Sequence, residues 1–271
     1  MTSFDAATAL TAVSSSETTK EWLGFLTTDW SIGPIPNGGY SAAVALRALL
    51  DHSGCEVPLS LTNHYYRPTI GGAPVTIRTE ILRAGRTTTH ADALLIQEDK
   101  VRVRSVAVLG AFPDSETIVP STPAAIPDPM DCPERDPKSQ GLNMTLLDSL
   151  EIRLHSDPTT TQPRTAHMDG WIRFRDGRPT DPLALCLFAD SFPPAILSAV
   201  PGTGWVPTIE LTSHVRAPAA PGWIRGEAWT ENVRGRTLIE NVRLWDETNT
   251  VVVEARQLAL LRERSEQSLA D

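Results

Sequence analysis

The 271-residue sequence is poor in the features that define several large protein classes. Its three cysteines, Cys55, Cys132 and Cys186, form no CxxC pair and have no spacing typical of metal ligands. We therefore expect reduced thiols, no metal site and no cofactor. No apolar run approaches the roughly 20 residues that a membrane helix needs, and no basic residue precedes Lys20, which is not typical of a signal peptide. These absences predict a cytoplasmic protein that does not bind a membrane.

The sequence also has no excess of positive charge, because its formal net charge is −9 and it contains no long basic run. Nucleic-acid affinity depends on many Lys and Arg contacts to phosphates, so we expect no nucleic-acid partner. The GxSxG, GxGxxG, HExxH and P-loop motifs are missing. With 41% hydrophobic and 21% charged residues, the composition is instead that of an ordinary globular protein.

An internal repeat becomes visible when the sequence is compared with itself at an offset of 150 positions. The triplet Gly85-Arg86-Thr87 then falls on Gly235-Arg236-Thr237, and window 61–112 contains 11 identities without a gap. About 3 identities would be expected from average residue usage. The chain is therefore predicted to be a tandem duplication.

Each copy combines one helix with a meander of extended segments. In the first copy we expect a helix over 39–50, a turn at 68–73, and extended segments over 59–67, 75–82, 87–97 and 100–109. In the second copy we expect a helix over 182–197, interrupted by two prolines, a turn at 217–222, and extended segments over 208–216, 223–231, 237–245 and 250–261. This order predicts an α+β fold in which each helix packs on one face of an antiparallel sheet.

A segment rich in proline and acidic residues separates the two copies. It can form neither a long strand nor a long helix, so we interpret residues 113–141 as a surface linker. The predicted domains are therefore residues 1–112 and residues 142–271, with a second irregular loop over 156–168.

Positions that differ between the copies are candidates for chemistry, because shared positions serve packing and turns. Gln257 lies on an otherwise apolar strand face, and its counterpart in the first copy is Ala107. Glu210 corresponds to Ser60, and Thr230 lies near the end of the following strand. The alternative interpretation is structural, with a core amide bonded to backbone and a solvated carboxylate. A carboxylate, a hydroxyl and a carboxamide on three strands could nevertheless converge on one site.

The segment Asn37-Gly38-Gly39 stands immediately before the helix of the first copy. Asn37 is a plausible N-cap. The glycines allow close approach of the backbone and leave N–H groups free at the helix start. Such groups can hold a carbonyl oxygen that gains negative charge, although a simple turn is the alternative. The second copy has Asp190 and Pro193-Pro194 in its helix and no glycine pair, so the two helices are not equivalent.

Five segments together resemble the acyl-CoA thioesterase II (TesB-like) family. NGGYSAAVALRAL and LSLTNHYYRPTIGGAPVTIRTEILRAGRTT are similar to the first half of these proteins. DGWIRFRDGRPTDPLALCLFADSFPPAI, TIELTSHVRAP and VVEARQLALLR are similar to the second half. The resemblance implies a double hotdog, in which each of two fused domains wraps a curved antiparallel sheet around a central helix.

The resemblance also implies hydrolysis of an acyl-CoA to a free acid and CoA. The family uses an Asp, a Thr or Ser, and a Gln, all in the second hotdog, to position and activate a water. Aligned by position, the Asp falls on Glu210 of TIEL and the Gln on Gln257 of RQLA. The hydroxyl residue falls near Thr230.

From these residues we expect hydrolysis without a covalent intermediate. Glu210 would act as general base, Thr230 and Gln257 would hold the water, and Gly38 or Gly39 would bind the thioester oxygen. Two alternatives stay open: a hotdog dehydratase, isomerase or cyclase acting on a thioester or polyketide-like intermediate, and an acyl-ligand-binding protein. We expect acyl-CoA or another acyl thioester as the substrate, a role in fatty acid metabolism, and a homo-oligomer of double-hotdog protomers.

Overall fold

The computed structural model describes residues 2–112, 117–138, 141–156, 165–200 and 205–262. The elements of the first half are α1 (Ser3–Ala7), β1 (Thr11–Ser15), β2 (Thr19–Leu26), β3 (Ser31–Ile32), β4 (Ile35–Pro36), α2 (Gly38–Ser53), β5 (Val57–Tyr65), β6 (Ala73–Ala84), β7 (Thr89–Gln97) and β8 (Lys100–Gly110). Those of the second half are the 3₁₀ turns η1 (Pro129–Asp131) and η2 (Thr145–Asp148), then β9 (Leu150–Ser156), β10 (His167–Phe174), α3 (Pro182–Phe188), α4 (Ile196–Ala199), β11 (Thr208–Val215), β12 (Ile224–Arg234), β13 (Thr237–Trp245) and β14 (Val251–Leu260).

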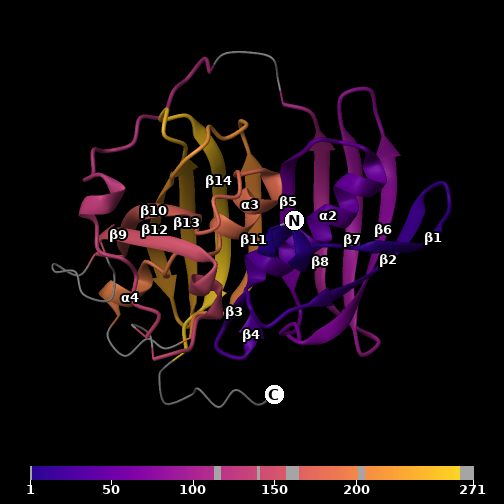
Figure 1. Cartoon of the computed structure of the whole chain (residues 1–271), viewed down its shortest axis with the longest axis horizontal. Coiled ribbons are helices and arrows are strands. Elements are labelled where there is room, and N and C mark those ends of the chain that lie inside the picture. The colour runs from indigo at the N-terminus through magenta and orange to yellow at the C-terminus, as the bar shows by residue number, and fades with distance from the viewer. Residues whose placement is uncertain (1, 113–116, 139–140, 157–164, 201–204, 263–271) are drawn as a thin grey trace.

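Twelve of these strands form one antiparallel sheet that runs through both halves of the chain (Figure 1). The strand order is β1-β2-β6-β7-β8-β5-β11-β14-β13-β12-β10-β9. The halves meet where β5 pairs with β11, and Thr62 there lies opposite Thr212, its counterpart at the 150-residue offset. Helices α2 and α3 pack against each other beside this junction. The predicted double hotdog is confirmed.

The strands of both meanders lie where the sequence predicts them. The sequence does not reveal β1, β2, β9 and β10, which extend the sheet at its two ends. The irregular loop expected over 156–168 overlaps β10, and its residues 157–164 lie outside the described part of the chain.

The two central helices differ in length for local reasons. Asn37 caps α2 through its side chain, which accepts a hydrogen bond from the Tyr40 N–H at 3.0 Å, and Gly54 ends this helix at a φ of 69°. In the second copy, α3 ends at Phe188 rather than continuing to 197. Pro193 and Pro194 provide no backbone N–H for a continuous helix, so only the short α4 follows.

The register of the sheet refines the repeat. Strands β5 and β8 match β11 and β14 at an offset of 150, because Leu61 pairs with Ala107 as Leu211 pairs with Gln257. Ala107 also pairs with Ala91, whereas Gln257 pairs with Glu240, so β7 and β13 match at an offset of 149. The chain from Glu240 to its partner Gln257 is one residue longer than the chain from Ala91 to its partner Ala107, which explains the difference.

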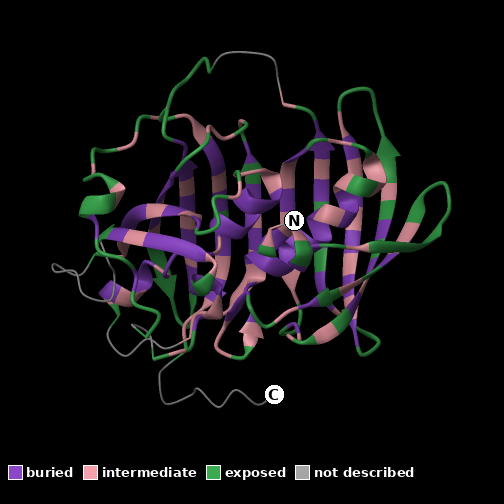
Figure 2. Cartoon of the chain, viewed as in Figure 1, coloured by how far each residue is buried: buried purple, intermediate pink, exposed green. Residues whose placement is uncertain are grey.

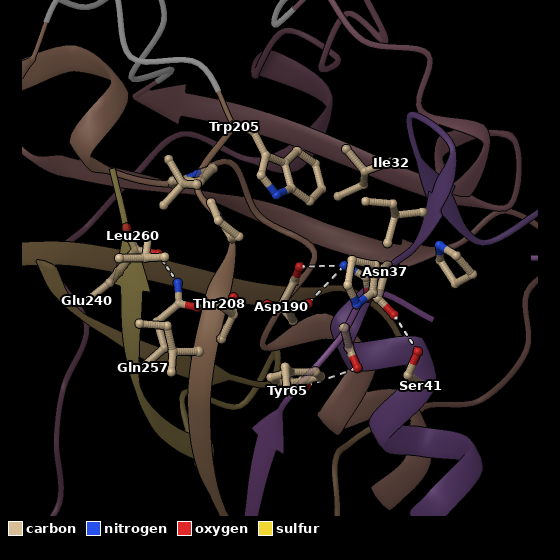
Figure 3. Close-up of a pocket in the computed structure, with 18 of the residues that line it drawn as sticks. Ile32, Asn37, Ser41, Tyr65, Asp190, Trp205, Thr208, Glu240, Gln257 and Leu260 are labelled. Atoms are coloured by element: carbon tan, nitrogen blue, oxygen red, sulfur yellow. Dashed lines mark hydrogen bonds between the residues drawn. The ribbon is translucent and has the colours of Figure 1, made fainter. Parts of the chain in front are cut away.

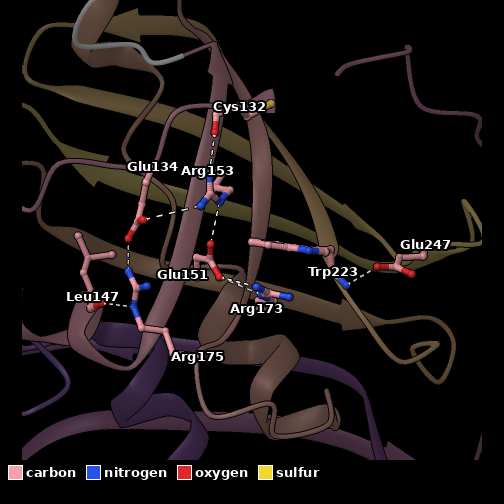
Figure 4. Close-up of polar contacts among 9 residues, drawn as sticks. All are labelled: Cys132, Glu134, Leu147, Glu151, Arg153, Arg173, Arg175, Trp223 and Glu247. Carbon is pink, nitrogen blue, oxygen red and sulfur yellow. Dashed lines mark hydrogen bonds and ion pairs between the residues drawn. The ribbon is translucent and has the colours of Figure 1, made fainter. Parts of the chain in front are cut away.

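The core lies on the helix-facing side of the sheet (Figure 2). Residues 117–138 belong to the segment predicted as a linker. They form hydrogen bonds and ion pairs with strands of the second half. Trp245 Nε1 donates to the Ser121 carbonyl at 3.0 Å, and Trp171 Nε1 donates to the Pro127 carbonyl at 3.0 Å. Glu134 forms ion pairs with Arg153 and Arg175 (Figure 4).

Within the described ranges, no helix is long and apolar enough to cross a membrane. The same residues include no group of three His, Cys, Asp or Glu side chains arranged to hold a metal ion.

Candidate active site

A cavity of about 330 Å³ lies where the two halves of the chain meet. The start of α2 lines it from the first half, and the end of α3 with β11, β13 and β14 lines it from the second half (Figure 3). Its apolar lining includes Ile32, Ile35, Leu142, Phe192, Trp205 and Leu260. Its polar lining includes Asn37, Asp190, Thr208, Glu240 and Gln257. A mostly apolar cavity with a few convergent polar groups is typical of a small-molecule site.

Asp190 lies two residues after the end of α3, and the start of α2 holds it by hydrogen bonds. The Asn37 side-chain amide donates to Asp190 Oδ2 at 3.0 Å, and the Gly39 N–H donates to the same oxygen at 2.8 Å. The Gly38 backbone also contributes a hydrogen bond to this carboxyl group, and the side chain lines the cavity. Burial raises the pKa of Asp190 to about 6, although these hydrogen bonds lower it in part. The carboxylate is therefore ionised near neutral pH and has an affinity for protons that suits a general base.

The two glycines before α2 make different contacts. The Gly39 N–H is bonded to Asp190, and the Gly38 carbonyl accepts the Tyr65 hydroxyl at 3.0 Å. A Cβ at Gly39 would lie 2.9 Å from Asp190 Cβ and 2.9 Å from the Cys186 and Leu187 carbonyl oxygens. Glycine is thus required because α2 and α3 approach closely. The Gly39 N–H, one of the two donors expected to bind the thioester oxygen, is thus already bonded to a carboxylate. The role expected of Gly38 stays a prediction.

Thr208, Gln257 and Glu240 form a chain of hydrogen bonds along the cavity wall. Thr208 Oγ1 donates to Gln257 Oε1 at 2.8 Å, and Gln257 Nε2 donates to Glu240 Oε1 at 2.7 Å. The Ala195 N–H donates to Glu240 Oε2 at 2.7 Å. Burial raises the pKa of Glu240 to about 7, and the charge of Asp190 adds to this increase against the hydrogen bonds that lower it. Gln257 thus lies in the cavity wall, bonded to side chains rather than to backbone.

Of the three residues predicted to converge, the structure brings together Thr230 and Gln257, but not Glu210. Thr230 pairs with Glu240, which pairs with Gln257, so these side chains share one face of the sheet. Thr230 Oγ1 lies 3.5 Å from Glu240 Oε2. Glu210 pairs with Leu258, the strand neighbour of Gln257, and therefore points to the opposite face. There it accepts a hydrogen bond from Thr212, outside the cavity.

Sequence reasoning missed Asp190, Thr208 and Glu240 as cavity residues. The reason for Thr208 is a β-bulge between Thr208 and Glu210. Two residues apart on a regular strand would share a face, but one extra residue in the bulge turns Thr208 to the buried side. Asp190 had one visible signal, because it stands in the second-copy helix where the copies differ.

Comparison with known proteins agrees with this architecture. Residues 26–110 match the family described as the acyl-CoA thioesterase N-terminal domain, and residues 124–261 match the acyl-CoA thioesterase C-terminal domain. The chain therefore belongs to the acyl-CoA thioesterase family. An uncharacterised protein of Mycobacterium tuberculosis is 26% identical, over 88% of this chain and 90% of its own length.

Two crystal structures are similar over nearly the whole chain. A candidate thioesterase II from Thermobifida fusca superposes with a TM-score of 0.86 at 29% identity, covering 97% of this chain and 98% of that one. A hotdog protein of unknown function from Alicyclobacillus acidocaldarius gives a TM-score of 0.84 at 22% identity, with the same coverage. The second similarity concerns the fold alone.

Proposed function

We propose that this protein hydrolyses an acyl thioester, with acyl-CoA as the substrate class, and that Asp190, Thr208 and Gln257 form its site. One observation carries the proposal: an ionisable carboxylate and a bonded hydroxyl–amide pair face the same largely apolar cavity. These residues supply the Asp, Thr and Gln that the family resemblance implies, all from the second half. The carboxylate is Asp190 rather than Glu210, and the hydroxyl is Thr208 rather than Thr230.

The hydrogen bonds suggest how a water would be used. The Thr208 hydroxyl donates to Gln257, so its oxygen can accept a hydrogen bond from a water in the cavity. Asp190 Oδ1 can accept the second water proton as general base. The water oxygen then attacks the thioester carbonyl carbon, and the C–S bond breaks. The proton held by Asp190 passes to the leaving thiolate, which gives a carboxylic acid and a thiol.

The apolar residues of the cavity suit the acyl part of such a substrate, because burial of methylene groups contributes about 0.8 kcal/mol for each group. The hydroxyl, amide and carboxylate in the same lining would then meet the polar thioester group. The cytoplasmic location, the homo-oligomer and the link to fatty acid metabolism stay predictions.

The test is thiol release from acyl-CoAs of several chain lengths, measured with a thiol-reactive dye. We expect Asp190→Asn to lower kcat by about 10²–10⁴-fold, because general base catalysis contributes that much. Thr208→Val should also lower kcat, because it removes the hydroxyl while keeping the shape of the side chain. Glu210→Gln changes a carboxylate on the opposite face of the sheet and should keep the wild-type rate.

The opposite pattern is a loss of kcat in Glu210→Gln and none in Asp190→Asn. It would identify Glu210 as the general base. A product with the mass of the acyl-CoA substrate but a different connectivity would identify a non-hydrolytic hotdog enzyme. Saturable binding without turnover would identify an acyl-ligand-binding protein.

A further inference from the structure

Glu240 is a carboxylate at the centre of the sheet face that lines the cavity, and it has no part in the proton transfer described above. Its exposed fraction is 3%. Within the part of the chain that the structure describes, its hydrogen-bonding neighbours are the Gln257 amide, the Ala195 N–H and the more distant Thr230 hydroxyl, all of them neutral groups. A buried charge held only by neutral donors costs free energy that an apolar residue would not. A buried acceptor at this position therefore calls for a functional reason.

The first copy shows that the fold itself does not need this carboxylate. The row Leu211, Gln257, Glu240 and Thr230 crosses β11, β14, β13 and β12. The equivalent row of the first copy crosses β5, β8, β7 and β6 and consists of Leu61, Ala107, Ala91 and Ile81. This apolar row packs in the core. The polar row is thus a feature of the half that contains Asp190.

The carboxylate fixes the direction of the hydrogen bonds that end at Thr208. An ionised Glu240 can only accept, so the Gln257 amide must turn its Nε2 toward Glu240. Gln257 Oε1 then faces Thr208 and accepts its hydroxyl hydrogen. The Thr208 oxygen keeps its lone pairs for the cavity. With the amide reversed, Thr208 would accept from Gln257 and direct its hydrogen into the cavity.

This direction decides how a water would be oriented. A water that donates one hydrogen to Thr208 and the other to Asp190 has an oxygen lone pair left for the thioester carbon. A Thr208 hydroxyl pointing into the cavity would instead donate to that lone pair and occupy it. The chemistry therefore depends on an acceptor two side chains away from the water.

We propose that Glu240 is a positioning residue for thioester hydrolysis, which holds the Gln257 amide in the orientation that makes Thr208 a hydrogen-bond acceptor toward the attacking water. The inference rests on the proposed function, because it assumes that a water at Thr208 and Asp190 is the nucleophile. Glu240 acts on the reacting water through Gln257 and Thr208.

The test compares Glu240→Gln with a double variant that exchanges the two side chains, Glu240→Gln with Gln257→Glu. The single variant offers one oxygen to two N–H donors, so the Gln257 amide should reverse. In the exchanged variant the new amide at position 240 accepts from Ala195 and donates to the new carboxylate at position 257. That carboxylate accepts from Thr208, so the original direction returns.

At pH 8, kcat for an acyl-CoA should fall about 10–100-fold in Glu240→Gln, the size of effect caused by misplaced reacting groups. The exchanged variant should recover at least tenfold of that loss. The dissociation constant of a non-hydrolysable thioether analogue of the acyl-CoA should stay within about twofold in both variants. Glu254→Gln, a carboxylate-to-amide change on neighbouring β14, is the matched control and should keep the wild-type kcat.

Wild-type kcat in Glu240→Gln would overturn the inference while leaving the proposed function intact. An exchanged variant no more active than Glu240→Gln would also overturn it, because the restored direction of the hydrogen bonds should restore kcat. If Glu240→Gln fails to fold, thiol release by the exchanged variant decides alone: activity supports the inference and its absence overturns it. No thiol release from the wild type would instead overturn the proposed function, and this inference with it.

Discussion

Replacing Asp190 by Asn should make the protein more stable while it removes the base. The Asn37 amide and the Gly39 N–H both donate to the same oxygen of this side chain, Oδ2. The amide oxygen of an Asn side chain can accept both of them, so the contact between α2 and α3 is kept. What disappears is a partly buried negative charge.

The magnitude follows from the raised pKa, which moves from 3.8 to about 6 in the folded protein. Between these values the native state binds the proton more tightly than the unfolded state, so the free energy of unfolding falls as pH rises. One pKa unit is about 1.4 kcal/mol, so the ionised Asp190 lowers the free energy of unfolding by up to about 3 kcal/mol above pH 6. Asp190→Asn should recover this amount at pH 8 and roughly half of it at pH 5.

Thermal unfolding followed by circular dichroism at pH 5 and pH 8 measures this difference. At about 2–4 °C for each kcal/mol, the variant should unfold roughly 6–12 °C above the wild type at pH 8. Two results would refute the interpretation that burial destabilises the ionised Asp190. One is a variant less stable than the wild type at pH 8, and the other is a difference in unfolding temperature of equal size at both pH values.

Two further predictions concern the same contact. The wild-type kcat/KM should rise with pH between about 6 and 7, because Asp190 and Glu240 must both be ionised. Burial raises their pKa values to about 6 and about 7. A pH–rate profile that stays flat from pH 5 to pH 8 would contradict this. Gly39→Ala should lower the free energy of unfolding by about 1–3 kcal/mol, because its Cβ would lie 2.9 Å from three atoms of the α3 segment. Denaturant titration measures that cost, and Asp51→Ala, at an exposed position of the same helix, should change stability far less.

The sequence was sufficient for the fold because the relevant signals are local and repeated. Strand alternation, the Asn37 cap and the proline pair each act within a few residues, and the duplication shows each signal twice. Gln257 could be singled out for the same reason, since a polar residue on an apolar strand face is visible without any partner.

The rest of the site could not be predicted, because it depends on distant contacts and on one irregularity. Asp190 gains its role from Asn37 and Gly39, which are more than 150 positions away. Glu210 and Thr208 are two positions apart and would share a face on a regular strand, yet the bulge separates them. A single extra residue reverses every assignment beyond it, and no pattern in the sequence marks where it lies.

The contact between Asp190 and the start of α2 joins residues from the two copies, so the cavity belongs to neither copy alone. In a dimer of identical subunits, such a contact would occur twice, and any change in one subunit would appear in both. Fusion into one chain removes that constraint. The row around Ala107 and Ala91 could then become pure core while the row around Gln257 and Glu240 became polar. The first half thus contributes the start of a helix to a site whose other polar residues come from the second half. Neither half could be exchanged without changing that site.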